Sequence, residues 1–276
     1  MRTLFMVLGL AGAVVVAVVA VVAWGGPLSD LRPGVIDPSA PQPEREVQGR
    51  EILAAALGAH GGRAAWQSHA GQTFRLRDQW RGLWGFITPW PAADISMRVV
   101  QQRHTFDSEV TFLDGPDPGL RWGMEDWRTW VQRPDGARQW QPHDDASFTL
   151  PTVHYFVELP LRLGEAELVR YVGPRTIGAH TYDVVFLTWQ SWAPNPDYDQ
   201  YLVFVDVETR RIAKVQYTVR RIARFATGTS HLEAYEEVGG VLLPTRIAVS
   251  SDPEDDPLDF HHLMTFHDLA VQEHKP

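Results

Sequence analysis

Apolar and polar residues alternate along much of the chain between residues 182 and 249. In one such segment Val215 and Tyr217 alternate with polar neighbours. A period of two buries one side-chain face and leaves the other in water, which is typical of an antiparallel sheet. The polar stretch 206–211 and the pair Gly239-Gly240 interrupt the alternation, so the pattern predicts strands joined by tight hairpin turns.

The same alternation predicts further strands in the first half of the chain. They cover residues 73–80, 95–101, 106–112, 121–132 and 137–141. The last two flank Arg133-Pro134-Asp135-Gly136, a good turn sequence because proline presets the backbone at the second turn position.

Two segments have helical spacing instead. The first runs from Val47 to about residue 68 and is interrupted by Gly61-Gly62. The second lies within 144–170, where Val153, Phe156, Val157 and Leu161 recur at helical intervals and Pro160 predicts a kink. A short apolar helix in an otherwise antiparallel chain suits a lid over an open sheet. A helix that plugs one end of the core is the alternative.

The amino-terminal residues 1–24 form a separate unit. Residues 4–24 are apolar and uncharged, and about 20 such residues are long enough to cross a bilayer as a helix. We therefore expect a membrane anchor, with a cleaved signal peptide as the alternative. Residues 25–46 carry five of the 20 prolines and predict a linker, so the folded domain is expected to span 47–276.

Composition narrows the class of partner. The formal net charge of −9 and the lack of a basic stripe argue against nucleic acid. The chain has no cysteine, which excludes disulfides, thiolate metal sites and an acylated lipoprotein cysteine. Its 11 tryptophans fit either a tryptophan-rich core or an aromatic-lined cavity for an apolar ligand.

The sequence gives only weak signals for catalytic or metal-binding residues. His261, His262 and His267 are close in sequence, but on a strand His262 points away from the other two, so surface or strand-end positions explain them better. No GxSxG, P-loop or GxGxxG motif is present. We therefore expect a protein that is not an enzyme, with no catalytic residues, metal or cofactor.

The order of the segments resembles a known superfamily. It is carried by HGGRAAW at 60–66, TVHYFVELPLRL at 152–163, and the strand sequences YDVVF, DQYLVFVDVETRRI and EAYEEVGGVLLPTRI. The region 48–250 resembles the LolA-like lipoprotein carriers, in particular the outer-membrane lipoprotein-sorting-like proteins. The resemblance implies an open antiparallel half-barrel whose apolar concave face is covered by helices, with a cavity for acyl chains. The chain differs in its apparent anchor and in lacking the acylated cysteine of the outer-membrane receptor.

These observations predict an α+β fold that is mainly β, with an N-terminal helix and a central helical lid. They leave two functions open. The first is a lipid- or acylated-protein-binding module anchored in the bacterial inner membrane and facing the periplasm, or secreted to the periplasm if the leader is cleaved. The second is an envelope scaffold that binds a protein partner. If residues 153–161 cap an apolar pocket, we expect its wall to include the following residues: Trp80, Met97, Phe112, Trp122, Trp130, Phe156 and Trp189.

Overall fold

The computed structural model describes residues 25–37, 39–103 and 105–273. Within them, 13 strands form one antiparallel sheet in the order β6-β5-β4-β3-β2-β1-β13-β12-β11-β10-β9-β8-β7. The strands are β1 (His69–Trp80), β2 (Asp94–Gln102), β3 (Ser108–Phe112), β4 (Arg121–Glu125), β5 (Arg128–Gln132), β6 (Gln139–Trp140), β7 (Leu168–Ile177), β8 (His180–Thr188), β9 (Tyr201–Asp206), β10 (Ile212–Thr218), β11 (Thr227–Val238), β12 (Val241–Ser250) and β13 (His262–Glu273). The helical elements are α2 (Pro43–Ala59), α3 (Gly62–Gln67), the 3₁₀ turn η1 (Gly82–Phe86), α4 (Asp144–Val157) and α5 (Leu159–Leu163).

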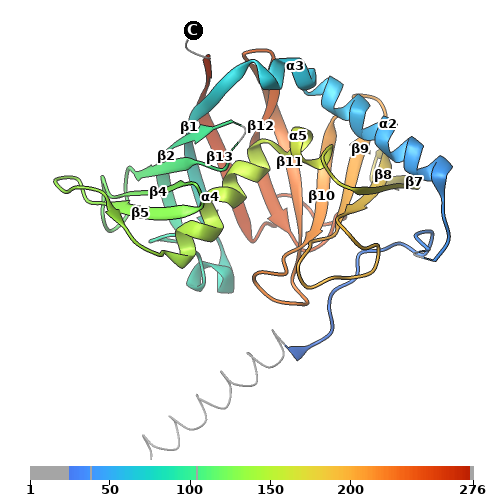
Figure 1. The fold of residues 1–276 in the computed structure, drawn as a ribbon, viewed down its shortest axis with the longest axis horizontal. Helices are drawn as coiled ribbons and strands as arrows, with labels where there is room; N and C mark the ends of the chain where they lie inside the picture. The colour runs from blue at the N-terminus through green and yellow to red at the C-terminus, as the bar shows by residue number, and fades with distance from the viewer. Residues whose placement is uncertain (1–24, 38, 104, 274–276) are drawn as a thin grey trace, which may run out of the picture.

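The strand order explains why a helix crosses the sheet. The chain starts the sheet at its centre with β1, runs outward to the edge strand β6, and reappears at the opposite edge as β7. The connection between the two edges is α4 and α5, which lie across one face of the curved sheet (Figure 1). Because β6 and β7 do not pair, the sheet remains an open half-barrel, as expected.

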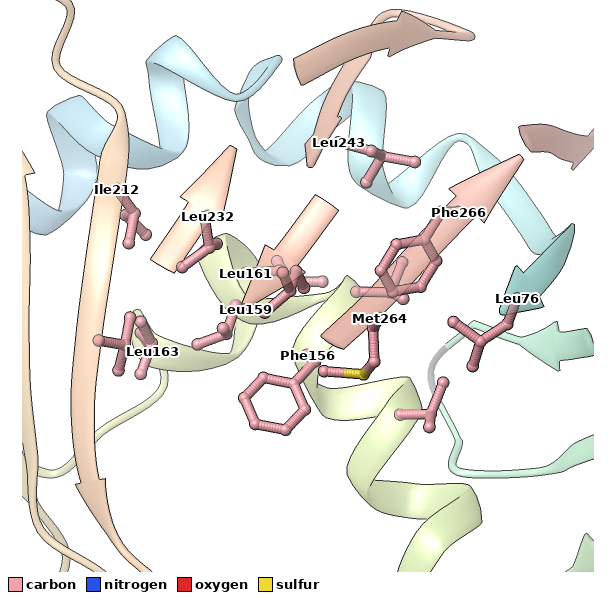
Figure 2. Packing of buried hydrophobic residues seen from close by; sticks show 14 of the residues in the cluster. Leu76, Phe156, Leu159, Leu161, Leu163, Ile212, Leu232, Leu243, Met264 and Phe266 are labelled. Atoms are coloured by element: carbon pink, nitrogen blue, oxygen red, sulfur yellow. The ribbon is translucent and has the colours of Figure 1, made fainter. Parts of the chain in front are cut away.

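The main core lies between this face and the helices. Helix α2 packs against β7 and β8, and α4 packs against β3, β4 and β5. Figure 2 shows Phe156 of α4 and Leu159 and Leu161 of α5 in the same buried cluster as Leu232 of β11 and Met264 of β13. The helices are therefore part of the principal hydrophobic core.

Several expected elements are confirmed. Gly239 and Gly240 form the turn between β11 and β12 with positive φ angles of 58° and 78°, which glycine adopts without steric cost. The helical break comes at Glu158, and Pro160 lies in the first turn of α5, where a missing N–H is tolerated.

The single strand expected at 121–132 is wrong. Asp126 and Trp127 have φ angles of 49° and 61°, so the chain reverses there and forms the hairpin β4–β5. Positive φ at both central residues is typical of a hairpin turn. Asp126 is the only residue at this point that favours such a turn, and without a following glycine it is a weak local signal.

The sequence predicted that the segment before α2 is a linker. In the structure this segment packs against the folded domain. Ile36 is buried against Phe204 and its outward-facing neighbours on β8. Arg170 donates hydrogen bonds to the carbonyl oxygens of Asp37, at 2.7 Å, and Ala40, at 3.2 Å. The reason is that β8 and β9 are apolar on both faces, so their outer face also needs a cover. Helix α2 begins at Pro43, earlier than Val47, and the start of the independently folding unit stays a prediction.

The proposed anchor, residues 1–24, lies outside the described residues. Among the residues that are described, no helix combines the length and apolar character needed to cross a membrane.

Candidate functional site

A cavity of about 450 Å³ lies between α4 and the sheet. Its wall includes residues from α4, from the strands beneath it, from the β1–β2 connection and from the connection between β10 and β11. The principal lining residues are Phe148, Thr152, Val153, Tyr155, Phe156, Tyr201, Val215, Tyr217, Met264, Trp80, Trp84, Pro89 and Trp90. Most of them are apolar or aromatic, so the cavity suits an apolar ligand.

The roof of the cavity follows from helical spacing on α4. Val153 and Phe156 are three residues apart and therefore share the face directed at the sheet. The Phe156 ring meets Tyr217 edge-on, with centroids 5.6 Å apart. A charge introduced at Phe156 would therefore face the cavity and the aromatic floor.

Three tyrosines, one from α4 and two from the strands beneath it, supply polar groups to the cavity. The rings of Tyr155 and Tyr217 lie 6.1 Å and 6.4 Å from the ring of Tyr201. Burial raises the pKa of Tyr217 to about 12 and places the pKa of Tyr201 well above its usual value. Burial also raises the pKa of Tyr155, so all three phenols are protonated at neutral pH and carry O–H groups that can donate to a ligand.

A buried carboxylate fixes the aromatic wall at the β1 end. The indole N–H of Trp90 donates to Asp78 Oδ2 at 2.9 Å, and His262 Nε2 lies 2.8 Å from Asp78 Oδ1. Trp80 stacks on His262 with centroids 4.0 Å apart. Asp78 thus holds the Trp90 indole by a hydrogen bond and lies against His262, on which Trp80 stacks, so these three rings form one side of the cavity.

The structure places the seven predicted pocket residues in different environments. Trp80 and Phe156 line the cavity. Met97, Phe112 and Trp122 lie in the packed core under the other side of α4, where Phe112 and Trp122 meet edge-on at 5.0 Å.

The remaining two predicted residues also lie away from the cavity wall. The Trp130 ring lies over Gly123 on the outer face, beside Arg121 and Arg138. Trp189 packs on Tyr201 at 5.8 Å, behind the cavity wall. The ligand-binding role of all seven residues stays a prediction.

Sequence reasoning missed Asp78, Trp90 and the tyrosine cluster as site residues. The alternation in β10 places Tyr217 on the same face as Val215, so this tyrosine had a detectable signal. Asp78 had no detectable signal, because a single carboxylate in a strand does not reveal that the rings of two residues distant in sequence will contact it.

A second cluster of polar residues lies where α4 meets α5. His154, Glu158 and Arg103 are buried, and Arg162 is nearly so. Glu158 lies 2.7 Å from Arg162 and 3.3 Å from His154. Burial alone raises the pKa of Glu158, but His154, Arg162 and Arg103 together lower it below its usual value. This cluster links the two helices through charge to Arg103, the residue that follows β2.

Comparison with known proteins establishes the fold. No protein-family model and no curated protein matches the chain. Among solved structures, a DUF1329 family protein from Desulfovibrio piger is similar, with 9% identity, a TM-score of 0.52, and coverage of 84% of this chain and 95% of that one. A putative outer membrane lipoprotein-sorting protein domain from Vibrio parahaemolyticus is similar over the same shares of the two chains, with 12% identity and a TM-score of 0.52. The predicted LolA-like resemblance is thereby confirmed for the fold.

Proposed function

We propose that this chain is a membrane-anchored binding protein of the bacterial periplasm that holds a lipid, or the acyl chain of a lipidated protein, beneath α4. The observation that carries the proposal is the apolar cavity of about 450 Å³. This volume falls within the range of about 300–1,000 Å³ typical of small-molecule sites.

The composition of the wall supports an acyl ligand. Transfer of a methylene group from water to an apolar site contributes about 0.8 kcal/mol, so a chain of many methylenes gains from a wall of this kind. The tyrosine phenols and Asp78 supply a few polar groups beside that wall. The name of the Vibrio parahaemolyticus domain, with its reference to lipoprotein sorting, agrees with such a ligand.

The anchor is part of the proposal. Residues 4–24 hold the chain in the inner membrane, and the domain lies on the periplasmic side. Cleavage of this segment would instead release a periplasmic protein with the same cavity.

Binding of a fluorescent fatty acyl probe tests the cavity. Phe156→Asp places a charge in the wall, and Val249→Trp fills the cavity with an apolar side chain. We expect each change to weaken binding at least about tenfold, which corresponds to about 1.4 kcal/mol. Val47→Trp, at an exposed position on α2, is the matched control and should bind as the wild type does. Retained circular dichroism separates loss of the site from loss of the fold.

Native mass spectrometry of the protein extracted from its own membrane identifies the ligand class. Bound lipid supports the proposal. A wild-type protein that binds no acyl probe and copurifies with a protein partner while its cavity is empty would replace it with the scaffold function.

A further inference from the structure

Two loops that border the cavity lie at the same end of the half-barrel. In β1 and β13, Trp80 pairs with His262, so the β1–β2 loop starts beside the beginning of β13. The register continues from His262 to Val249 and from Ser250 to Thr229. It therefore brings the β10–β11 loop, residues 219–226, to this end as well.

These two loops expose large apolar side chains. The β1–β2 loop presents Leu83, Trp84, Phe86 and Ile87, and the β10–β11 loop presents Ile222 and Phe225. Leu83 and Phe86 are 83% and 86% exposed. We call these six residues the apolar rim. Trp84 and Ile222 also line the cavity, so the rim borders the route into it.

The amino-terminal segment joins the domain at the same place. Ser29 N donates to the carbonyl oxygen of Arg224 at 3.0 Å. Arg220 donates to Ser29 Oγ and to the Ser29 carbonyl oxygen, both at 2.6 Å. Because Arg220 and Arg224 belong to the β10–β11 loop, the described chain enters the domain beside the apolar rim (Figure 1).

This attachment leaves little chain between the rim and the apolar segment 4–24. Five peptide units separate Trp24 from Ser29, so an extended chain spans at most about 18 Å between them. A tether of that length keeps the rim close to any bilayer that the segment 4–24 enters.

We propose that the apolar rim inserts into the leaflet from which the anchor emerges, so that the cavity opens onto lipid and an acyl chain passes between bilayer and cavity without crossing water. The inference rests on the proposed function for its anchor and its ligand. The net charge of −9 makes attraction to anionic lipid an unsuitable source of binding. Insertion is therefore driven by apolar contact and needs no anionic lipid.

The absence of cysteine from the chain allows a clean test of insertion. Phe86→Cys in the full chain is labelled with an environment-sensitive fluorophore and reconstituted into phosphatidylcholine vesicles that contain nitroxide-labelled lipid. Glu208→Cys is the control, because it is exposed in the β9–β10 turn at the opposite end of the sheet. Interfacial segments bury about 5–10 Å into the headgroup region, so we expect at least about threefold stronger quenching at Phe86 than at Glu208.

Equal quenching at the two positions overturns the inference. If the fluorescence of the label at position 86 changes with protein density and not with lipid, the rim contacts a second copy of the chain and the inference is wrong. If quenching at this position requires anionic lipid and disappears with salt, apolar insertion is contradicted.

A transfer assay separates this inference from the proposed function. Leu83→Asp combined with Phe86→Asp changes two exposed residues that do not line the cavity. We expect the rate of acyl-probe uptake from vesicles to fall at least about tenfold, while the affinity for probe delivered from detergent stays within about twofold. Unchanged uptake overturns the inference and leaves the proposed function intact. A wild-type cavity that binds no probe overturns the proposed function, and the quenching result at Phe86 still stands.

Discussion

Glu158 offers the most direct test of how α4 and α5 are held on the sheet. It is the carboxylate of a buried cluster in which Arg162 lies 2.7 Å away, His154 lies 3.3 Å away and Arg103 is close enough to lower its pKa. The change Glu158→Gln preserves the shape of the side chain and removes its charge. It leaves Arg103 and Arg162 without the carboxylate that balances them.

The expected cost follows from the burial of the cluster. Glu158 is 1% exposed, and removal of one partner from a buried ion pair costs about 3–5 kcal/mol because the other charge remains buried. For a domain of this size 1 kcal/mol lowers the melting temperature by about 2–4 °C, so we expect a decrease of at least about 6 °C.

Glu165 provides a matched control. It lies 3.8 Å from the same Arg162 but is 49% exposed, and exposed pairs contribute about 0–1 kcal/mol. Urea unfolding followed by tryptophan fluorescence and circular dichroism should therefore show a large loss for Glu158→Gln and almost none for Glu165→Gln.

The pH dependence adds an independent check. The pKa of Glu158 in the folded protein is lowered from its usual value of 4.5, so its contribution is fully present above that value and is lost as the pH falls through the folded pKa. The difference between wild type and Glu158→Gln should shrink in acid. The reasoning is refuted if the two glutamine variants lose equal free energy at neutral pH, since that result would mean that water solvates the cluster.

Three further predictions concern other parts of the chain. Burial lowers the pKa of His231 from 6.5 to about 4. The stability of the wild type should therefore fall as the pH drops from 6.5 toward 4, by up to about 3 kcal/mol, and His231→Gln should remove that slope in urea titrations. Ile36→Ala should cost about 2 kcal/mol of unfolding free energy because Ile36 is buried on the outer face, whereas the exposed Val35→Ala should cost less than about 0.5 kcal/mol; equal losses would contradict the packing role. Full-length protein should stay in carbonate-washed membranes if residues 4–24 anchor it, and a soluble form starting near Trp24 would disprove retention.

The alternation of faces in the sheet and several element boundaries can be predicted from local sequence patterns. Val215 and Tyr217 lie on one face of β10 because successive side chains of a strand point in opposite directions. Gly239-Gly240 and Pro160 mark a turn and a helix start because their backbone preferences are local. Such features depend on residues that are close in sequence, so a single chain reveals them.

The residues that each face meets depend on how the whole chain packs. His60, at the end of α2, is buried, with Nδ1 2.9 Å from the carbonyl oxygen of Leu242 and Nε2 accepting from the amide of Ile212. Met97 and Phe156 have similar apolar character, yet Met97 is packed in the core and Phe156 lines the cavity. The period of a strand or helix fixes the direction of a side chain, but the position of α4 over the sheet fixes whether that side chain meets another residue or open space. That position follows from the crossing between the two sheet edges, which is a property of the whole chain.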